Sequence, residues 1–223
     1  MPPSPSPAGT GTVGAAADNA GQPLLLAGGL GLLLLLFAVG LLAFVLLGRE
    51  PTFTTLGEAL LVAGVAEIIA GMALRRGTGW IALMLVGAAS LIGGFLLLGQ
   101  ADLGIRRFSR ELMGPIPGHT IIILWLLVRA ILQAGYCVIR GHNAAGLWIS
   151  AFIAAAAGIL LVAKVPSVSA LWILFGLHRD LLLMLGSGVG LGLMASAIAI
   201  LTLARAHAAG RHAPGGWRES EAG

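Results

Sequence analysis

Long apolar runs separated by short polar connections make up most of this 223-residue chain. A helix needs about 20 apolar residues to cross the hydrocarbon core of a bilayer, which is about 30 Å thick. The runs have about this length, so each is expected to cross a membrane as a helix. The predicted spans are residues 24–47, 55–74, 80–98, 119–139, 146–163 and 181–203.

The last apolar stretch covers residues 168–204, which is too long for one span and too short for two spans with a loop. Charged groups gather at His178, Arg179 and Asp180, so we expect the helix to break or to leave the membrane there. The alternative is a last helix that begins near residue 168. With either start, the predicted transmembrane domain covers residues 23–206.

Both ends of the chain lie outside this predicted domain. Residues 1–22 are rich in Pro, Ala, Gly and Ser and carry one charge, Asp18. They lack the apolar surface that offsets the entropy lost when a chain becomes ordered. We therefore expect a disordered N-terminal tail over residues 1–22 and a polar C-terminal tail over residues 207–223.

An internal repeat underlies the spans. Arg75, Arg140 and Arg205 each close an apolar run and are spaced 65 residues apart. Connections that contain proline separate neighbouring helices, because proline interrupts helical hydrogen bonding. They include Pro51, Pro115, Pro117 and Pro166. The predicted fold class is an all-α membrane protein of six transmembrane helices, arranged as three tandem helical hairpins in the same orientation.

Composition supports a membrane protein and argues against other classes. Hydrophobic residues make up 58% of the chain and charged residues only 10%, whereas a soluble protein carries about 25% charged residues. The formal charge of +4 comes mainly from arginines at the ends of apolar runs. That placement is typical of membrane flanks, so lipid is the expected partner and nucleic acid is not. The flanking basic residues, Lys164 included, divide evenly between the two sides and predict no orientation.

Two charged residues lie near the middle of apolar spans, where a charge is costly. Glu67 is near the middle of the second span and Arg129 is near the middle of the fourth, with Gln133 one turn further along. They form a candidate intramembrane polar group. One interpretation is a structural pair between helices, and the other is a polar path for protons or another solute.

His178, Arg179 and Asp180 form a second candidate group, at the edge of the last span. A histidine there could respond to pH near neutrality. The simpler interpretation is an interfacial cap whose charges reach water. The loop that contains Arg106, Arg107 and Arg110 is also expected at the membrane surface, as a short amphipathic helix on anionic lipid.

Glycines are frequent in the last span, where two overlapping small-residue patterns occur. Residues four apart on a helix face let two backbones approach closely, within the chain or between copies of a homo-oligomer. These packing candidates are Gly186, Gly188, Gly190 and Gly192. A phosphate-binding loop would need a preceding strand and a following Lys-Ser/Thr pair, and neither is present.

The sequence contains no catalytic motif. No metalloprotease motif, nucleophile elbow or catalytic carboxylate pair occurs, and the histidines do not cluster as metal ligands. The single cysteine, Cys137, rules out an internal disulfide. We expect a protein that is not an enzyme and that uses no metal or cofactor.

The last third of the chain carries a family resemblance. The segment from Val165 reads Val-Pro-Ser-Val-Ser-Ala-Leu-Trp, and Asp180 stands before Leu181, fourteen positions after Pro166. With Trp148 at the entry to the fifth helix, this pattern resembles the HdeD family of acid-resistance membrane proteins over about residues 23–206.

The resemblance implies six helices in a bacterial inner membrane, both termini in the cytoplasm, and a role in tolerance of acid or envelope stress. It implies no active site, and it favours a last helix that is continuous through Asp180. The first functional hypothesis is a non-enzymatic stress-tolerance protein of HdeD type. The second is a small transporter or channel with a polar path near Glu67 and Arg129.

Overall fold

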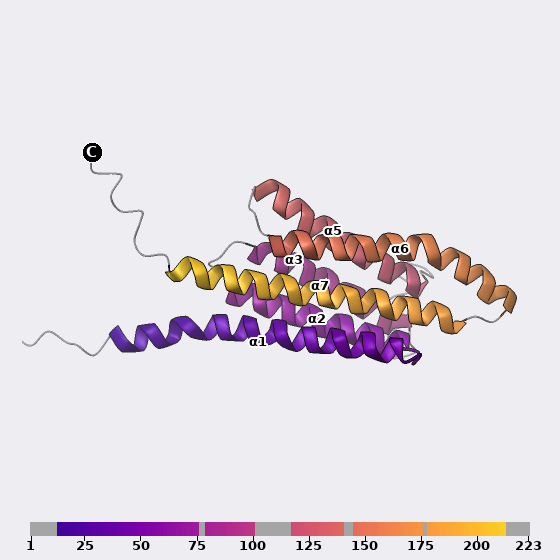
Figure 1. Cartoon of the computed structure of the whole chain (residues 1–223), viewed down its shortest axis with the longest axis horizontal. Helices are drawn as coiled ribbons and strands as arrows, with labels where there is room; N and C mark the ends of the chain where they lie inside the picture. The colour runs from indigo at the N-terminus through magenta and orange to yellow at the C-terminus, as the bar shows by residue number, and fades with distance from the viewer. Residues whose placement is uncertain (1–12, 76–78, 101–116, 141–144, 176–177, 213–223) are drawn as a thin grey trace, which may run out of the picture.

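The computed structural model describes residues 13–75, 79–100, 117–140, 145–175 and 178–212 of the chain. These residues form a bundle of six helices, shown in Figure 1. Each helix is long and apolar enough to cross a membrane, which confirms the all-helical, multi-pass class. The helices are α1 (Val13–Leu46), α2 (Phe53–Ala73), α3 (Trp80–Gln100), α5 (Gly118–Arg140), α6 (Ala145–Phe175) and α7 (His178–His212).

The helices pack in a closed ring, with α7 reaching across it. Each helix packs on its neighbour in the chain, α1 closes the ring on α7, and α7 also contacts α2 and α5. In the most apolar part of α7, 67% of the residues are buried, against 28% in α1. The last helix is therefore the central one, and α1 exposes most of its surface at the outside of the bundle.

Chain direction alternates from helix to helix. The beginning of α1 and the end of α7 lie at the same end of the bundle (Figure 1). Helix α1 stops at a tight turn around Gly48, whose φ of 71° suits glycine. There the Gly48 and Arg49 amides donate to the carbonyls of Val45 and Phe44, which is a Schellman motif.

Close approach of α2 and α3 depends on two facing pairs of glycines. A Cβ added to Gly64 would lie 2.8 Å from the Gly87 carbonyl oxygen, and one added to Gly94 would lie 2.8 Å from the Gly57 oxygen. These distances are too short for any side chain, so the two antiparallel backbones touch. None of these four glycines is among the packing positions predicted from the sequence.

The four glycines predicted as packing positions are all buried in α7. Gly186 and Gly190 face α1, where the nearest side chains include Val45 and Leu42. Gly188 and Gly192 face α5 and α6, with Leu161 and Trp125 close by. The glycines thus serve packing within one chain, on two sides of the central helix.

Helix packing does not group the helices as three equal hairpins. The most extensive contact joins α2 to α3, which belong to different predicted units, and α1 packs more on α7 than on α2. The tandem repeat therefore stays a prediction from sequence.

The last two helices are separated close to His178, where the charged residues predict a break, and not at Pro166. Helix α6 continues through Pro166 to Phe175, and α7 begins only at His178. A last helix that begins near residue 168 is therefore wrong. The last helix does continue through Asp180, which lies in its first turn, but it starts only at His178. A proline removes one backbone hydrogen bond, and an apolar helix can accommodate that loss where its other bonds remain.

Both predicted tails are partly helical. Helix α1 already begins at Val13, inside the segment expected to be disordered, and α7 runs to His212, past the expected end at residue 206. Alanines at positions 15–17 and at positions 204, 206, 208 and 209 favour helix. Extending an existing helix also avoids the cost of nucleating a new one. Residues 1–12 and 213–223 lie outside the described residues.

Candidate functional site

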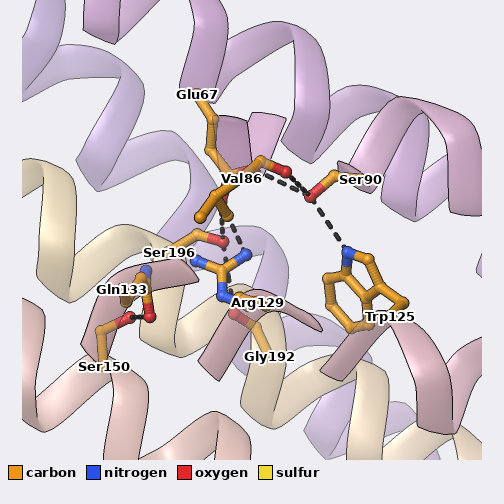
Figure 2. A network of polar contacts seen from close by, with 9 residues as sticks. All are labelled: Glu67, Val86, Ser90, Trp125, Arg129, Gln133, Ser150, Gly192 and Ser196. Atoms are coloured by element: carbon orange, nitrogen blue, oxygen red, sulfur yellow. Dashed lines mark hydrogen bonds and ion pairs between the residues drawn. The ribbon is translucent and has the colours of Figure 1, made fainter. Parts of the chain in front are cut away.

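A cluster of polar side chains lies inside the apolar bundle. Six buried polar residues have no exposed surface, and together with Trp125 they join five helices, all but α1. Figure 2 shows them around the guanidinium group of Arg129. We call this group the polar cluster: Glu67 of α2, Ser90 of α3, Trp125, Arg129 and Gln133 of α5, Ser150 of α6, and Ser196 of α7.

A buried ion pair lies at the centre of the polar cluster. Nη1 of Arg129 donates to Oε1 of Glu67 over 2.7 Å, and both side chains are 0% exposed. The helices α2 and α5 run in the same direction, so mid-helix residues reach a similar depth. Removal of two charges from water is expensive, and a short hydrogen-bonded pair offsets much of that cost.

The second carboxylate oxygen of Glu67 has its own donor. The Ser90 hydroxyl lies 2.9 Å from Oε2 of Glu67, and Nε1 of Trp125 donates to the Ser90 oxygen over 3.0 Å. The indole ring of Trp125 also lies 5.8 Å from the guanidinium carbon of Arg129, within range of a cation–π contact. Trp125 therefore holds both the serine and the arginine in place.

Helix α7 contributes a third donor to Glu67. The hydroxyl of Ser196 lies 2.6 Å from Oε1 of Glu67, closer than the 3.2 Å to its own helix carbonyl at Gly192. The carboxylate thus accepts from α3, α5 and α7 while it is anchored on α2. A carboxylate with three donors is well solvated by the protein itself.

Gln133 forms the outer part of the cluster. Its Oε1 accepts from the Ser150 hydroxyl of α6 over 2.9 Å. Its Nε2, together with Nε and Nη2 of Arg129, has no hydrogen-bond partner among the described residues. Three buried donor nitrogens thus remain unpaired on α5.

The structure brings together the three residues predicted for the intramembrane group, and it adds four that the sequence analysis missed: Ser90, Trp125, Ser150 and Ser196. Each of the three serines has apolar residues on both sides of it in the sequence. Serine is common at helix contacts in membranes, so position alone does not mark it as a partner of a distant carboxylate.

The second predicted group does not join the polar cluster. His178, Arg179 and Asp180 are the first residues of α7, and the side chain of Asp180 is exposed. Sixteen residues of helix separate Asp180 from Ser196, or about 24 Å. The arginine-rich loop predicted to lie on the headgroups falls within residues 101–116, outside the described residues.

The cluster offers hydrogen bonds and charge, and it shows no metal-ligand set. Among the described residues, no three or more His, Cys, Asp or Glu side chains gather where they could hold a metal ion. Cys137 is buried as a free thiol. Fold and site together define a multi-pass helical membrane protein with a fully buried ionic network.

Comparison of the chain with protein-family models, with curated proteins and with solved structures found no match.

Proposed function

We propose that this chain is a non-enzymatic membrane protein in which the polar cluster fixes the arrangement of the helices. The observation that carries the proposal is that Glu67 and Arg129 bond to each other and are 0% exposed. Apolar packing between membrane helices is weakly directional, because lipid tails are as apolar as the side chains. A charged, hydrogen-bonded network that joins α2, α3, α5 and α7, with a separate bond from Gln133 to Ser150 of α6, favours one arrangement over others.

A transporter or channel would need the same charges to face water at some stage. The direct ion pair and the three donors on the Glu67 carboxylate favour a structural role instead. The two hypotheses differ in whether water-soluble reagents reach the cluster. In a Cys137→Ser background, Ser196→Cys should resist a membrane-impermeant thiol reagent, whereas Arg75→Cys, exposed just past the end of α2, should react. Labelling of Ser196→Cys as fast as Arg75→Cys would contradict the structural role.

The biological role within this proposal is tolerance of acid or envelope stress in a bacterial inner membrane, with both termini cytoplasmic. It is supported by the resemblance of the sequence around Pro166 and Asp180 to the HdeD family. The test is survival of a deletion strain at low pH, complemented with the natural chain or with variants. Glu67→Gln and Asp180→Asn are the informative variants, and Glu58→Gln, exposed on the same helix as Glu67, is the control.

We expect Glu67→Gln to complement poorly and Glu58→Gln to complement fully, because only Glu67 belongs to the polar cluster. Equal survival of the deletion strain and the natural strain at low pH would refute the stress role. It would leave the structural role of the cluster to be judged by the labelling experiment.

A further inference from the structure

The guanidinium group of Arg129 uses only part of its donor capacity. Its Nη1 donates to Glu67, while Nε and Nη2 have no acceptor among the described residues. These two nitrogens share one edge of the planar group, which is the edge that binds carboxylates, phosphates and other anions through two parallel hydrogen bonds. The edge best suited to an anion is therefore the unpaired one.

Gln133 adds a third unpaired donor, one helical turn from Arg129. Its Oε1 is held by Ser150, and its Nε2 has no acceptor. The side chains of Arg129 and Gln133 are both 0% exposed, so bulk water does not solvate these nitrogens. Buried donors nearly always have a partner in folded proteins. All three atoms are donors, so the missing partner is an acceptor.

The surroundings limit the size and the charge of that acceptor. It must be small, because the residues that present the donors are completely buried. Glu67 and Arg129 are the only charged side chains among the buried residues that the structure describes, and together they are neutral. The neighbours from α3, α6 and α7 are the serines Ser90, Ser150 and Ser196. A bound anion would leave one net negative charge, which is costly at low dielectric unless a proton neutralises it.

We propose that Arg129 and Gln133 bind a small monovalent anion such as chloride inside the bundle, and that Glu67 takes up one proton when the anion binds. Protonated Glu67 still accepts from Ser196 and Arg129, and it stays neutral beside the new negative charge. The proton and the anion both come from solution. Their opposite charges cancel, so the net charge of the cluster does not change. This inference does not depend on the proposed stress role.

The test uses the full chain, purified throughout in chloride-free sodium gluconate. Its midpoint of thermal unfolding is measured against added sodium chloride, with total ionic strength held constant, at pH 5, 6.5 and 8. A ligand that binds only the folded state raises this midpoint with the logarithm of its concentration. We expect chloride to act more strongly at low pH, with the apparent affinity rising by at most about tenfold per pH unit for one coupled proton.

Variants separate the anion site from general salt effects. Gln133→Met and Arg129→Lys should lose most of the chloride response, because each removes part of the donor set. Glu67→Gln should keep the response at every pH and lose its pH dependence, because the amide is always neutral. Ser187→Ala is the matched control, since this serine donates to a carbonyl of its own helix outside the cluster.

A chloride response that is absent in the natural chain, or equal in Gln133→Met and the natural chain, would overturn the proposal. Water or the Gln133 amide oxygen would then satisfy Arg129. A response with the same pH dependence in Glu67→Gln would overturn the proton coupling. If Arg129→Lys fails to fold, crystals soaked in bromide decide the matter, since an anomalous peak beside Nε and Nη2 is expected and its absence would exclude the site.

Discussion

Glu67 and Arg129 stand 62 residues apart in the chain and meet inside the bundle over 2.7 Å. Neither side chain has any exposed surface. Each charge would be very costly alone in an apolar interior, and together they form a neutral pair. The pair therefore couples α2 to α5 more specifically than apolar packing can.

Loss of Arg129 should lower the stability of the protein far more than loss of an arginine at the end of a span. Arg129→Met leaves the Glu67 carboxylate without its cation, so we expect the free energy of unfolding to fall by about 3–5 kcal/mol. The measurement is unfolding in mixed micelles by a denaturing detergent. Arg75→Met is the control, because Arg75 is exposed at the end of its run, and it should change little. Equal effects of the two variants would contradict a structural ion pair.

Adding Glu67→Gln to Arg129→Met should partly restore the stability that Arg129→Met removes. In the double variant Glu67→Gln with Arg129→Met, no charge remains in the cluster, so the loss should be smaller than the sum of the two single losses. We expect a coupling free energy of about 1–3 kcal/mol from the complete double-mutant cycle. Strict additivity in the same unfolding assay would mean that the two side chains act independently.

Ser196 and Ser187 lie on the same helix and differ in their partners. Ser196 donates to Glu67 of α2, whereas Ser187 donates to Leu183 of its own helix. We expect Ser196→Ala to lower the free energy of unfolding by about 0.5–2 kcal/mol, the range for interhelical hydrogen bonds in membranes. Ser187→Ala should have a smaller effect. A larger effect of Ser187→Ala would show that the bond to Glu67 contributes little.

The contact between α2 and α3 should not accept a methyl group. In Gly64→Ala the new Cβ would meet the backbone oxygen of Gly87 at 2.8 Å, so the helices must move apart. We expect a loss of about 1–3 kcal/mol, the usual cost of overpacking. Gly40→Ala is the control, because no atom lies within 4 Å of its added Cβ, and the substitution should be neutral or stabilising. A neutral Gly64→Ala would mean that the two helices are farther apart than described.

Tyr136 of α5, which packs on α3, holds the residue just before the start of α3. Its hydroxyl oxygen accepts from the backbone amide of Gly79 over 2.7 Å, at a residue whose φ of 92° suits glycine. Tyr136→Phe removes the acceptor, so we expect faster hydrogen exchange at the Gly79 amide and a loss of about 1 kcal/mol in stability. Unchanged exchange at Gly79 would show that its amide has another partner.

Much of the architecture could be predicted from sequence, because the bilayer imposes a length and a polarity on every span. The apolar runs gave six spans close to the apolar parts of the helices. The cost of a buried charge also marked Glu67 and Arg129 before any contact was known. Prolines were less informative, since Pro166 lies within α6 rather than between two helices.

The partners of the ion pair depend on tertiary structure. Ser90, Ser150 and Ser196 look alike in sequence, and only the packing of α3, α6 and α7 shows that Ser90 and Ser196 contact Glu67 while Ser150 contacts Gln133. Only the packing of the helices, likewise, shows that Nε and Nη2 of Arg129 have no partner among the described residues.

The sequence by itself determined the class of protein, the number of spans and the charged residues that need partners, because these follow from the transfer of each segment out of water. Only the tertiary structure decided that α7 is central, that glycines bring α2 and α3 into contact, and which donors surround Glu67. Those features depend on distances between helices, and nearly every apolar surface in a membrane is compatible with every other. The polar cluster and the glycine contacts therefore select one packing among many.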